Sequence, residues 1–383
     1  MSIFREKKNL VRLIAFILAA GFAVFAFTYG VVQFAHRDPG YYDVGRTPDA
    51  DAVAYGSGAH FLWYAEGNSN AIRRELNTVQ KAWSAALIYA YKLLDANTLY
   101  ENFTNIASLN AAPGQPLTVS EDLFAVLSDA KQRMEEEKAF SLFAGPLFKE
   151  WTTLRYLETP EDFDPLRDPD EAELLRAITE MINTPGMFSL ELTAPDQATL
   201  VISPVWHEFA AGHETEGPVL DLNLMHDAYL LDLIARELKK QGYTKGYLYT
   251  DSGCSIWLEE KADSTYTLYR PDGDSVTRDR DIPYPSPSSY CMFTAFPLNE
   301  ETEGYYQLTE NGKTVYRHPF INAATGEPGN LLLSAGIAGG PEDLPDLTAK
   351  MIELTAMTAE EDVKAFAEKL PETRRFEYIL QQQ

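Results

Sequence analysis

Residues 310–328, ENGKTVYRHPFINAATGEP, indicate a β-hairpin that delivers a loop of unusual composition. Asn311 and Gly312 form the dipeptide that best tolerates positive φ in a two-residue turn. Two short segments with strand composition flank this turn, YYQL before it and KTVY after it. The loop that starts at His318 is therefore expected to follow directly from the end of a strand.

The composition is that of a folded globular protein, with 383 residues of which 45% are hydrophobic and 12% aromatic. The formal net charge of −25 repels the phosphates of nucleic acid, so nucleic acid is excluded as a partner. The sequence contains no glycine-rich loop of the dinucleotide-binding or Walker type. A kinase or a dehydrogenase is therefore not expected.

An uncharged apolar run at residues 13–34 is long enough, as a helix, to cross the roughly 30 Å hydrocarbon core of a membrane. Basic residues precede it, so the positive-inside rule predicts a cytoplasmic tail at residues 1–12 and a single-pass anchor at residues 13–35. A cleaved signal peptide is the alternative, because it has the same charged start and apolar stretch. Residues 36–58 are expected to form a tether and residues 59–383 an extracytoplasmic domain.

The rest of the chain predicts helices and strands in mixed order. The clearest helix begins at Asn68 or Ser69, because apolar residues then recur every three or four positions. A capping box from Thr118 to Glu121 predicts a second helix. Without the regular alternation of a doubly wound sheet, the order predicts an α+β fold. Further helices are expected near residues 170–182, 228–240, 347–357 and 360–370, and strands near residues 60–64, 188–192, 199–202, 246–250, 255–258, 266–269 and 290–296.

Several residues suggest chemistry but lack the spacing that it needs. His207 and His213 are six positions apart, which matches neither a helical i,i+4 pair nor a zinc site, so no metal site is predicted there. The segment DSGC at residues 251–254 lacks the glycine of a nucleophile elbow, and a tight connection between strands is expected. Cys254 and Cys291 leave two alternatives, one disulfide or two buried thiols.

The loop from His318 resembles the signature of the FAD:protein FMN transferases, the ApbE-like flavin transferases. That signature reads histidine, two apolar residues, then Asp-Pro-Arg-Thr-Gly-x-Pro. Asn322 stands in place of the Asp and Ala324 in place of the Arg. The matching residues are His318, Thr325, Gly326 and Pro328.

Other segments resemble that family in the order in which the family shows them. Residues 93–110, which include Tyr100, resemble a stretch that ends in SxIxxLN. Residues 139–151, AFSLFAGPLFKEW, resemble Ala-Phe-Asp, three residues, Gly-Pro-Leu, three residues and Trp, with Ser141 in place of the Asp. Together these segments extend the resemblance over nearly the whole predicted extracytoplasmic region.

The stretch DLNLMHDAY, which starts at Asp221, resembles the family's Asp-Leu-Gly-Gly-x-x-Lys/Glu-Gly-Tyr. Asp221 is retained, and Asp227 occupies the charged position. The three glycines are replaced by Asn223, Leu224 and Ala228. Because side chains there fill space that glycines leave open, we expect a closed or remodelled pocket.

The resemblance implies an ApbE-like fold with mixed or antiparallel sheets and flanking helices, and FAD as the cofactor. The family cleaves the FAD pyrophosphate and passes FMN to a Thr or Ser hydroxyl of an acceptor protein, with Mg²⁺ neutralising phosphate charge. Its metal ligands include an Asp and a Thr or Ser four positions later, but here Asp346 is followed at that spacing by Lys350. A protonated Lys cannot ligate a metal, although it can neutralise a phosphate. We therefore predict no metal ligand, and the sequence gives Mg²⁺ little support.

Position by position, the resemblance makes Asp227 the candidate catalytic residue, and a helix cap is the alternative role for Asp221. Because the motifs are incomplete, we expect a protein without ordinary FMN transfer that still binds a flavin, another nucleotide or a partner protein. The alternatives are an active divergent transferase that modifies an extracytoplasmic redox protein, and a structural subunit of a membrane complex. The candidate cofactor-binding residues are Tyr100, Ala139, Phe140, Ser141, Asp221, His318, Asn322 and Lys350.

Overall fold

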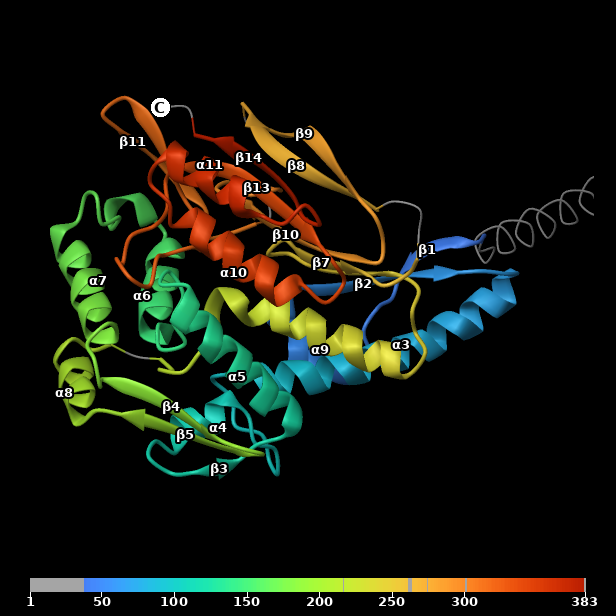
Figure 1. Ribbon diagram of the computed structural model, residues 1–383, viewed down its shortest axis with the longest axis horizontal. Coiled ribbons are helices and arrows are strands. Elements are labelled where there is room, and N and C mark those ends of the chain that lie inside the picture. Colours follow the sequence, from blue (N-terminus) through green and yellow to red (C-terminus); the bar gives the residue numbers. More distant parts are fainter. Residues whose placement is uncertain (1–37, 216, 261–263, 274, 300–301, 382–383) are drawn as a thin grey trace, which may run out of the picture.

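A computed structural model of the chain (Figure 1) describes residues 38–215, 217–260, 264–273, 275–299 and 302–381. Its strands are β1 (Gly40–Asp43), β2 (Ala59–Ala65), β3 (Leu117–Thr118), β4 (Phe188–Thr193), β5 (Gln197–Ile202), β6 (Tyr247–Thr250), β7 (Cys254–Trp257), β8 (Ser264–Asp272), β9 (Ser275–Tyr284), β10 (Ser288–Thr294), β11 (Tyr306–Glu310), β12 (Lys313–Arg317), β13 (Leu332–Gly339) and β14 (Arg375–Leu380). Its α-helices are α2 (Pro48–Ala54), α3 (Ser69–Leu94), α4 (Ile106–Ala111), α5 (Glu121–Glu136), α6 (Gly145–Arg155), α7 (Pro169–Ile182), α8 (Pro204–Gly212), α9 (His226–Lys240), α10 (Leu344–Thr355) and α11 (Glu360–Lys369). Short 3₁₀ turns are η1 (Tyr55–Ser57), η2 (Pro160–Asp162) and η3 (Asn223–Met225).

A seven-stranded antiparallel sheet lies at the centre, in the order β1-β2-β6-β7-β10-β13-β14. Helices α3, α9 and α10 pack on one face, as Figure 1 shows. Buried residues of alternating strand positions, such as Leu248, Ile256 and Ile337, join these helices in the main hydrophobic core. The prediction of an α+β fold is therefore confirmed.

The opposite face of β10 and β13 is covered by the long β8–β9 hairpin. Tyr266 and Ile282 of the hairpin form a small separate core with Tyr290 of β10 and Ala338 of β13. Successive side chains of a strand point to opposite faces. Tyr290 thus faces the hairpin while its neighbour Cys291 faces the helices.

Helix α3 follows its sequence prediction closely. Asn68 caps its N-terminus, because its side chain accepts a hydrogen bond from the backbone N–H of Ala71 at 3.1 Å. Ile72, Val79 and Trp83 recur along one side and are buried in the main core.

Helix α5 is capped differently from the prediction. Ser120, and not Thr118, accepts the hydrogen bond from the N–H of Leu123, because Thr118 is already paired in β3.

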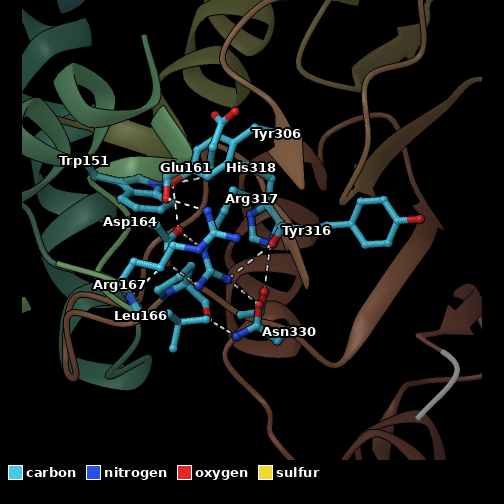
Figure 2. A network of polar contacts seen from close by, with 12 residues as sticks. Trp151, Glu161, Asp164, Leu166, Arg167, Tyr306, Tyr316, Arg317, His318 and Asn330 are labelled. Atoms are coloured by element: carbon cyan, nitrogen blue, oxygen red, sulfur yellow. Dashed lines mark hydrogen bonds and ion pairs between the residues drawn. The ribbon is translucent and has the colours of Figure 1, made fainter. Parts of the chain in front are cut away.

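The predicted hairpin of residues 310–328 is confirmed as β11 and β12, with Asn311 and Gly312 at positive φ in its turn. Figure 2 shows the polar network that ties this hairpin to the segment after α6. Arg317 Nε donates to Asp164 Oδ2 at 2.6 Å and Nη2 to Oδ1 at 3.1 Å. Tyr306 Oη also donates to Asp164, and Arg317 Nη1 donates to Asn330 Oδ1, both at 2.8 Å. The two charged side chains are only 2% and 0% exposed, so this is a fully buried ion pair.

Helix α6 is held in place by a close backbone approach at Gly145, its first residue. A Cβ atom at this position would overlap the backbone carbonyl of Pro218. Only glycine lets the two segments lie this close. The contact joins α6 to the chain that leads into Asp221.

Two parts of the sequence prediction need correction. Of the segment expected to be a tether, residues 40–57 instead belong to the domain, because β1 pairs with β2 and α2 packs on α3. The strands β9, β13 and β14 were not predicted, nor was α6. In the described ranges no helix is long and apolar enough to cross a membrane, and the predicted anchor at residues 13–35 lies outside them.

Candidate functional site

A cavity of about 1150 Å³ lies where β6, β7 and β10 meet the loops around α6 and α9. Its lining includes side chains from both faces of the sheet. Cys254 and Cys291 belong to the helix-facing side, whereas Tyr247 and Tyr290 belong to the side that faces the β8–β9 hairpin. Ligand pockets commonly have about 300–1,000 Å³. The cavity is therefore large enough for a nucleotide-sized ligand. Of the two expected alternatives, a closed or a remodelled pocket, the cavity agrees with the second.

The carboxylate of Asp227 is held at both oxygens in the cavity wall. His226 Nδ1 lies 3.0 Å from its Oδ1, and the hydroxyl of Ser252 donates to its Oδ2 at 2.6 Å. His226 and Asp227 begin α9, whereas Ser252 lies in the turn between β6 and β7. That turn is the predicted tight connection between strands. Two elements distant in sequence thus fix one acidic side chain.

Two more carboxylates, Asp95 and Asp221, line the cavity near His226. Asp221 Oδ1 accepts from the N–H of Asn223 at 2.9 Å. Burial raises the pKa of Asp221, against the opposing effects of this hydrogen bond and of His226. Burial alone would lower the pKa of His226, but Asp227, Asp221 and Asp95 outweigh it and raise the net value. The three carboxylates form an acidic cluster around one imidazole.

Tyrosine rings dominate the hairpin side of the cavity. Tyr266 and Tyr290 are stacked with ring centroids 4.3 Å apart, and Tyr247 and Tyr249 are stacked at 5.5 Å. All four rings line the cavity. Burial raises the pKa of Tyr290 well above its ordinary value, so its hydroxyl stays protonated. Tyr266 and Tyr290 are buried, whereas Tyr247 and Tyr249 are half-buried, and aromatic faces such as theirs suit a planar ring system in a ligand.

Cys254 and Cys291 lie directly opposite each other on β7 and β10. Both are buried free thiols, which is one of the two alternatives that the sequence left open. Cys254 Sγ is 3.7 Å from Thr348 Oγ1 of α10, which also lines the cavity. The thiols therefore contribute a largely apolar patch with weak S–H donors to the helix side of the cavity.

Comparison with known proteins identifies the family. A sequence model of the ApbE family matches residues 71–376. The chain belongs to the ApbE family. Its fold is similar to that of an ApbE protein from Thermotoga maritima, with a TM-score of 0.60 and 12% identity over 89% of this chain and 94% of that one. A mutant of the flavin transferase ApbE from Vibrio cholerae is also similar, with a TM-score of 0.46 and 13% identity over 89% of this chain and 97% of that one. Among curated proteins there is no match.

The structure brings two of the predicted site residues of this ApbE protein, Asp221 and Asp227, to the cavity. Tyr100 lies behind the wall and donates from its hydroxyl to Asp95 Oδ2 at 2.8 Å. It therefore orients a lining carboxylate without lining the cavity itself. The Asn at the end of the SxIxxLN segment has a similar supporting role, because Asn110 exchanges two hydrogen bonds with the backbone of Leu220 at 2.8 and 2.9 Å.

Ala139, Phe140 and Ser141 also lie outside the lining. The carbonyl of Ala139 accepts from the N–H of Ala323, and Phe140 is buried in the main core. Ser141 Oγ accepts from the N–H of Phe143 at 3.1 Å. These residues fix the backbone behind the site, and their predicted contact with a cofactor gains no support.

His318 and Asn322 have structural roles in this ApbE protein. His318 is completely buried, and its Nε2 is hydrogen bonded to the carbonyl of Gly329 at 2.8 Å. Burial lowers its pKa to about 3, so the imidazole is neutral. Asn322 Oδ1 accepts from the N–H of Ala324 at 2.8 Å and closes a local turn. Neither side chain lines the cavity, so the predicted direct contacts with a cofactor are not found.

The residues at which the resemblance implied the family's metal ligands, Asp346 and Lys350, lie on α10. Asp346 Oδ1 is 3.1 Å from Arg133 Nη1, and its Oδ2 is 2.5 Å from Arg374 Nη1. Both carboxylate oxygens are thus engaged by arginines. Lys350 lies outside the cavity lining. Its charge opposes the rise that burial causes in the pKa of Glu137. Among the residues that the structure describes, no group of three or more His, Cys, Asp or Glu side chains could hold a metal ion. The residues present therefore do not fit Mg²⁺ at this position.

One lost glycine of the family motif keeps its backbone conformation. Asn223 has a φ of 49°, in the left-handed region where Asn is the next best residue after glycine. Its side chain turns back to the carbonyl of Asp221 at 3.0 Å. The replacement therefore adopts a turn conformation that favours glycine, while Asn223 and Leu224 line the cavity.

The residues that sequence reasoning missed belong to other elements of the lining. His226 adjoins the predicted Asp227, which was its only signal. Ser252 acquires its role through a tertiary contact with Asp227, whereas Asp95 is held by a local hydrogen bond from Tyr100. Arg155 lies in α6, a helix for which no start or period was recognised, and no motif pointed to it.

Proposed function

We propose that this ApbE protein binds a flavin nucleotide in the cavity and does not carry out ordinary FMN transfer. The observation that carries the proposal is that Asp346, the metal ligand that the family resemblance implies, lies outside the cavity lining with its carboxylate bound by Arg133 and Arg374. The cavity itself favours binding, since it has the volume for a nucleotide and tyrosine faces for a planar ring.

Cleavage of a pyrophosphate needs neutralisation of the charge that develops on its oxygens. Asp95, Asp221 and Asp227 add negative charge to the cavity. In their part of the cavity these carboxylates disfavour approach of the scissile phosphates. Ring binding and bond cleavage thus depend on different residues, so this chain can keep the first without the second.

The test is a titration of the full-length protein, purified in mild detergent, with FAD in the presence and absence of Mg²⁺. We expect quenching of flavin fluorescence that does not depend on Mg²⁺, and no release of AMP. Replacement of Tyr249 by Ala should weaken binding about 3- to 10-fold, since an aromatic contact contributes about 0.5–1.5 kcal/mol. Tyr378→Ala, on β14 away from the lining, is the matched control and should bind like the wild type.

One observation favours a second candidate, an active divergent transferase. Asp227 bridges His226 and Ser252 in the cavity wall, which is an arrangement suited to proton transfer. That candidate predicts Mg²⁺-dependent AMP release that is lost in Asp227→Ala. AMP release of this kind would overturn the main proposal, whereas absence of flavin binding would point to the structural subunit of a membrane complex.

We also propose that the domain is anchored outside the cytoplasm by residues 13–35, with the N-terminus in the cytoplasm. The apolar run and the basic residues before it support this placement. Its partner would then be an extracytoplasmic redox protein or a subunit of a membrane complex. Extraction of membranes at alkaline pH should leave the chain in the membrane fraction, and its release into the supernatant would contradict the anchor.

A further inference from the structure

Arg155, the last residue of α6, is a buried cation in the cavity wall. It is only 6% exposed, and it lines the cavity together with Thr152 of the same helix. We propose that Arg155 binds the phosphate group of the ligand, so that the cavity selects phosphorylated flavins over the uncharged vitamin. This inference rests on the proposed flavin binding and assigns one end of the ligand to a named residue.

The hydrogen bonds of Arg155 leave its charge uncompensated. Nη1 donates to the carbonyl of Gly304 at 2.7 Å, and Nη2 donates to Thr152 Oγ1 at 3.4 Å. Its Nε is buried and has no hydrogen-bond partner. The guanidinium also lies over the ring of Tyr156, 5.6 Å from its centroid. All of these neighbours are neutral, and no carboxylate of the described residues forms an ion pair with it.

A second buried arginine in the same region shows what is missing. Arg317 is equally buried, and its guanidinium is held in bidentate fashion by Asp164. The charges of both arginines help to lower the pKa of His318, so both arginines lie near this histidine. An arginine stays protonated at any physiological pH, and burying its charge without a counter-ion is costly. Arg317 binds the two carboxylate oxygens of Asp164. Arg155 has the same guanidinium group but no carboxylate of the described residues bound to it.

The carboxylates of the cavity do not supply that acid. Asp227 is engaged by His226 and Ser252, and Asp95 by Tyr100 and backbone N–H groups. Asp221 accepts from the N–H of Asn223, and Asp251 lies 3.2 Å from His60. Thr302 and Tyr305 also line the cavity, and their hydroxyls can donate hydrogen bonds. A flat guanidinium that offers two parallel N–H groups, with hydroxyls beside it, matches a phosphate monoester or a pyrophosphate.

The experiment compares FMN with riboflavin, which differ by one phosphate, on the full-length protein. We expect the wild type to bind FMN at least about tenfold more tightly than riboflavin, as is typical of a hydrogen bond to a charged group. Arg155→Gln should abolish this preference and leave the affinity for riboflavin unchanged. Arg176→Gln, which removes a positive charge from the exposed side of α7, is the control and should keep the preference.

A second readout needs no flavin and checks that the variant folds. Inorganic pyrophosphate should raise the Tm of the wild type and not that of Arg155→Gln. Without ligand, Arg155→Gln should melt no lower than the wild type, because it removes an unpaired buried charge. If Arg155→Gln does not fold, Arg155→Lys should retain a weaker preference for FMN, since it keeps the charge and loses the fork.

The outcomes separate this inference from the proposed function. Equal binding of FMN and riboflavin by the wild type would overturn the phosphate role and leave flavin binding intact. Absence of binding by either flavin would overturn the proposed function. A rise in Tm with pyrophosphate that is lost in Arg155→Gln would even then support an anion site at Arg155.

Discussion

Replacement of Asp164 by Ala should lower the free energy of unfolding by about 3–5 kcal/mol, the cost of breaking a buried ion pair by removing one partner. The variant leaves Arg317 charged and buried, with Asn330 as its remaining side-chain partner. Urea unfolding of the full-length protein, followed by tryptophan fluorescence, would measure the loss. Trp151 reports on this region, because its Nε1 donates to the carbonyl of His318 at 2.9 Å.

An exposed ion pair provides the control for this variant. Glu66 and Lys245 lie 3.5 Å apart with largely solvated side chains, and Glu66→Ala should change the stability by less than about 1 kcal/mol. The double variant Asp164→Ala/Arg317→Met should regain part of the loss, since it removes the unpaired charge. If Asp164→Ala is no more harmful than Glu66→Ala, the network of Figure 2 does not stabilise the hairpin.

The same ion pair gives a pH dependence of known sign. Burial alone would raise the pKa of Asp164, but the hydrogen bonds and charge of Arg317 outweigh it and the net pKa is lowered. An unfolded Asp has a pKa of about 3.9. The contribution of the pair is therefore complete above that pH and is lost as the pH falls through the lower folded value. The stability of the wild type should decline in this acidic range more steeply than that of Asp164→Ala.

Gly145→Ala should destabilise the protein by about 1–3 kcal/mol or more, because the new methyl group would overlap the backbone carbonyl of Pro218. A backbone group cannot move aside as the end of a flexible side chain can. The strain should displace α6, which bears Thr152 and Arg155, and should also weaken flavin binding. Thermal unfolding and FMN titration on the same preparation would measure both effects.

Gly212→Ala is the matched control, since nothing lies within 4 Å of the added Cβ at the end of α8. Alanine is the better helix former, so this substitution should be neutral or stabilise the protein by up to about 1 kcal/mol. A Gly145→Ala protein as stable as Gly212→Ala would show that α6 can shift freely from the chain at residues 217–220.

The sequence predicted those helices and strands that carry their own signals, such as a cap, an apolar side or a turn dipeptide. Helix α3 has its own cap and a regular apolar side, and the β11–β12 hairpin has an Asn-Gly turn. Strand β13 gave no such signal. It is rich in small residues, and at Gly336 an added Cβ would overlap the ring of Tyr290. Its place in the sheet depends on neighbours that are distant in sequence.

The candidate site was only partly predictable for the same reason. Asp221 and Asp227 lie in one motif, and the structure places both in the cavity. His318 matches the motif, but its imidazole is hydrogen bonded to the backbone carbonyl of Gly329. Arg155 is unpaired because no carboxylate lies beside it in the described part of the fold. A local sequence pattern cannot predict this, because it does not show which distant residues surround a side chain. Similarly, the engagement of Asp346 by Arg133 and Arg374 joins three separate parts of the chain.

Strand β1 sets a limit on the reach of the whole domain. If residues 13–35 span the bilayer as proposed, only residues 36–39 separate the membrane from the edge of the central sheet. Four residues extend at most about 14 Å. The domain would then work within one protein radius of the lipid surface, unable to swing out toward a freely diffusing protein. A macromolecule held in the same membrane would meet the cavity only at a height matched to this short connection.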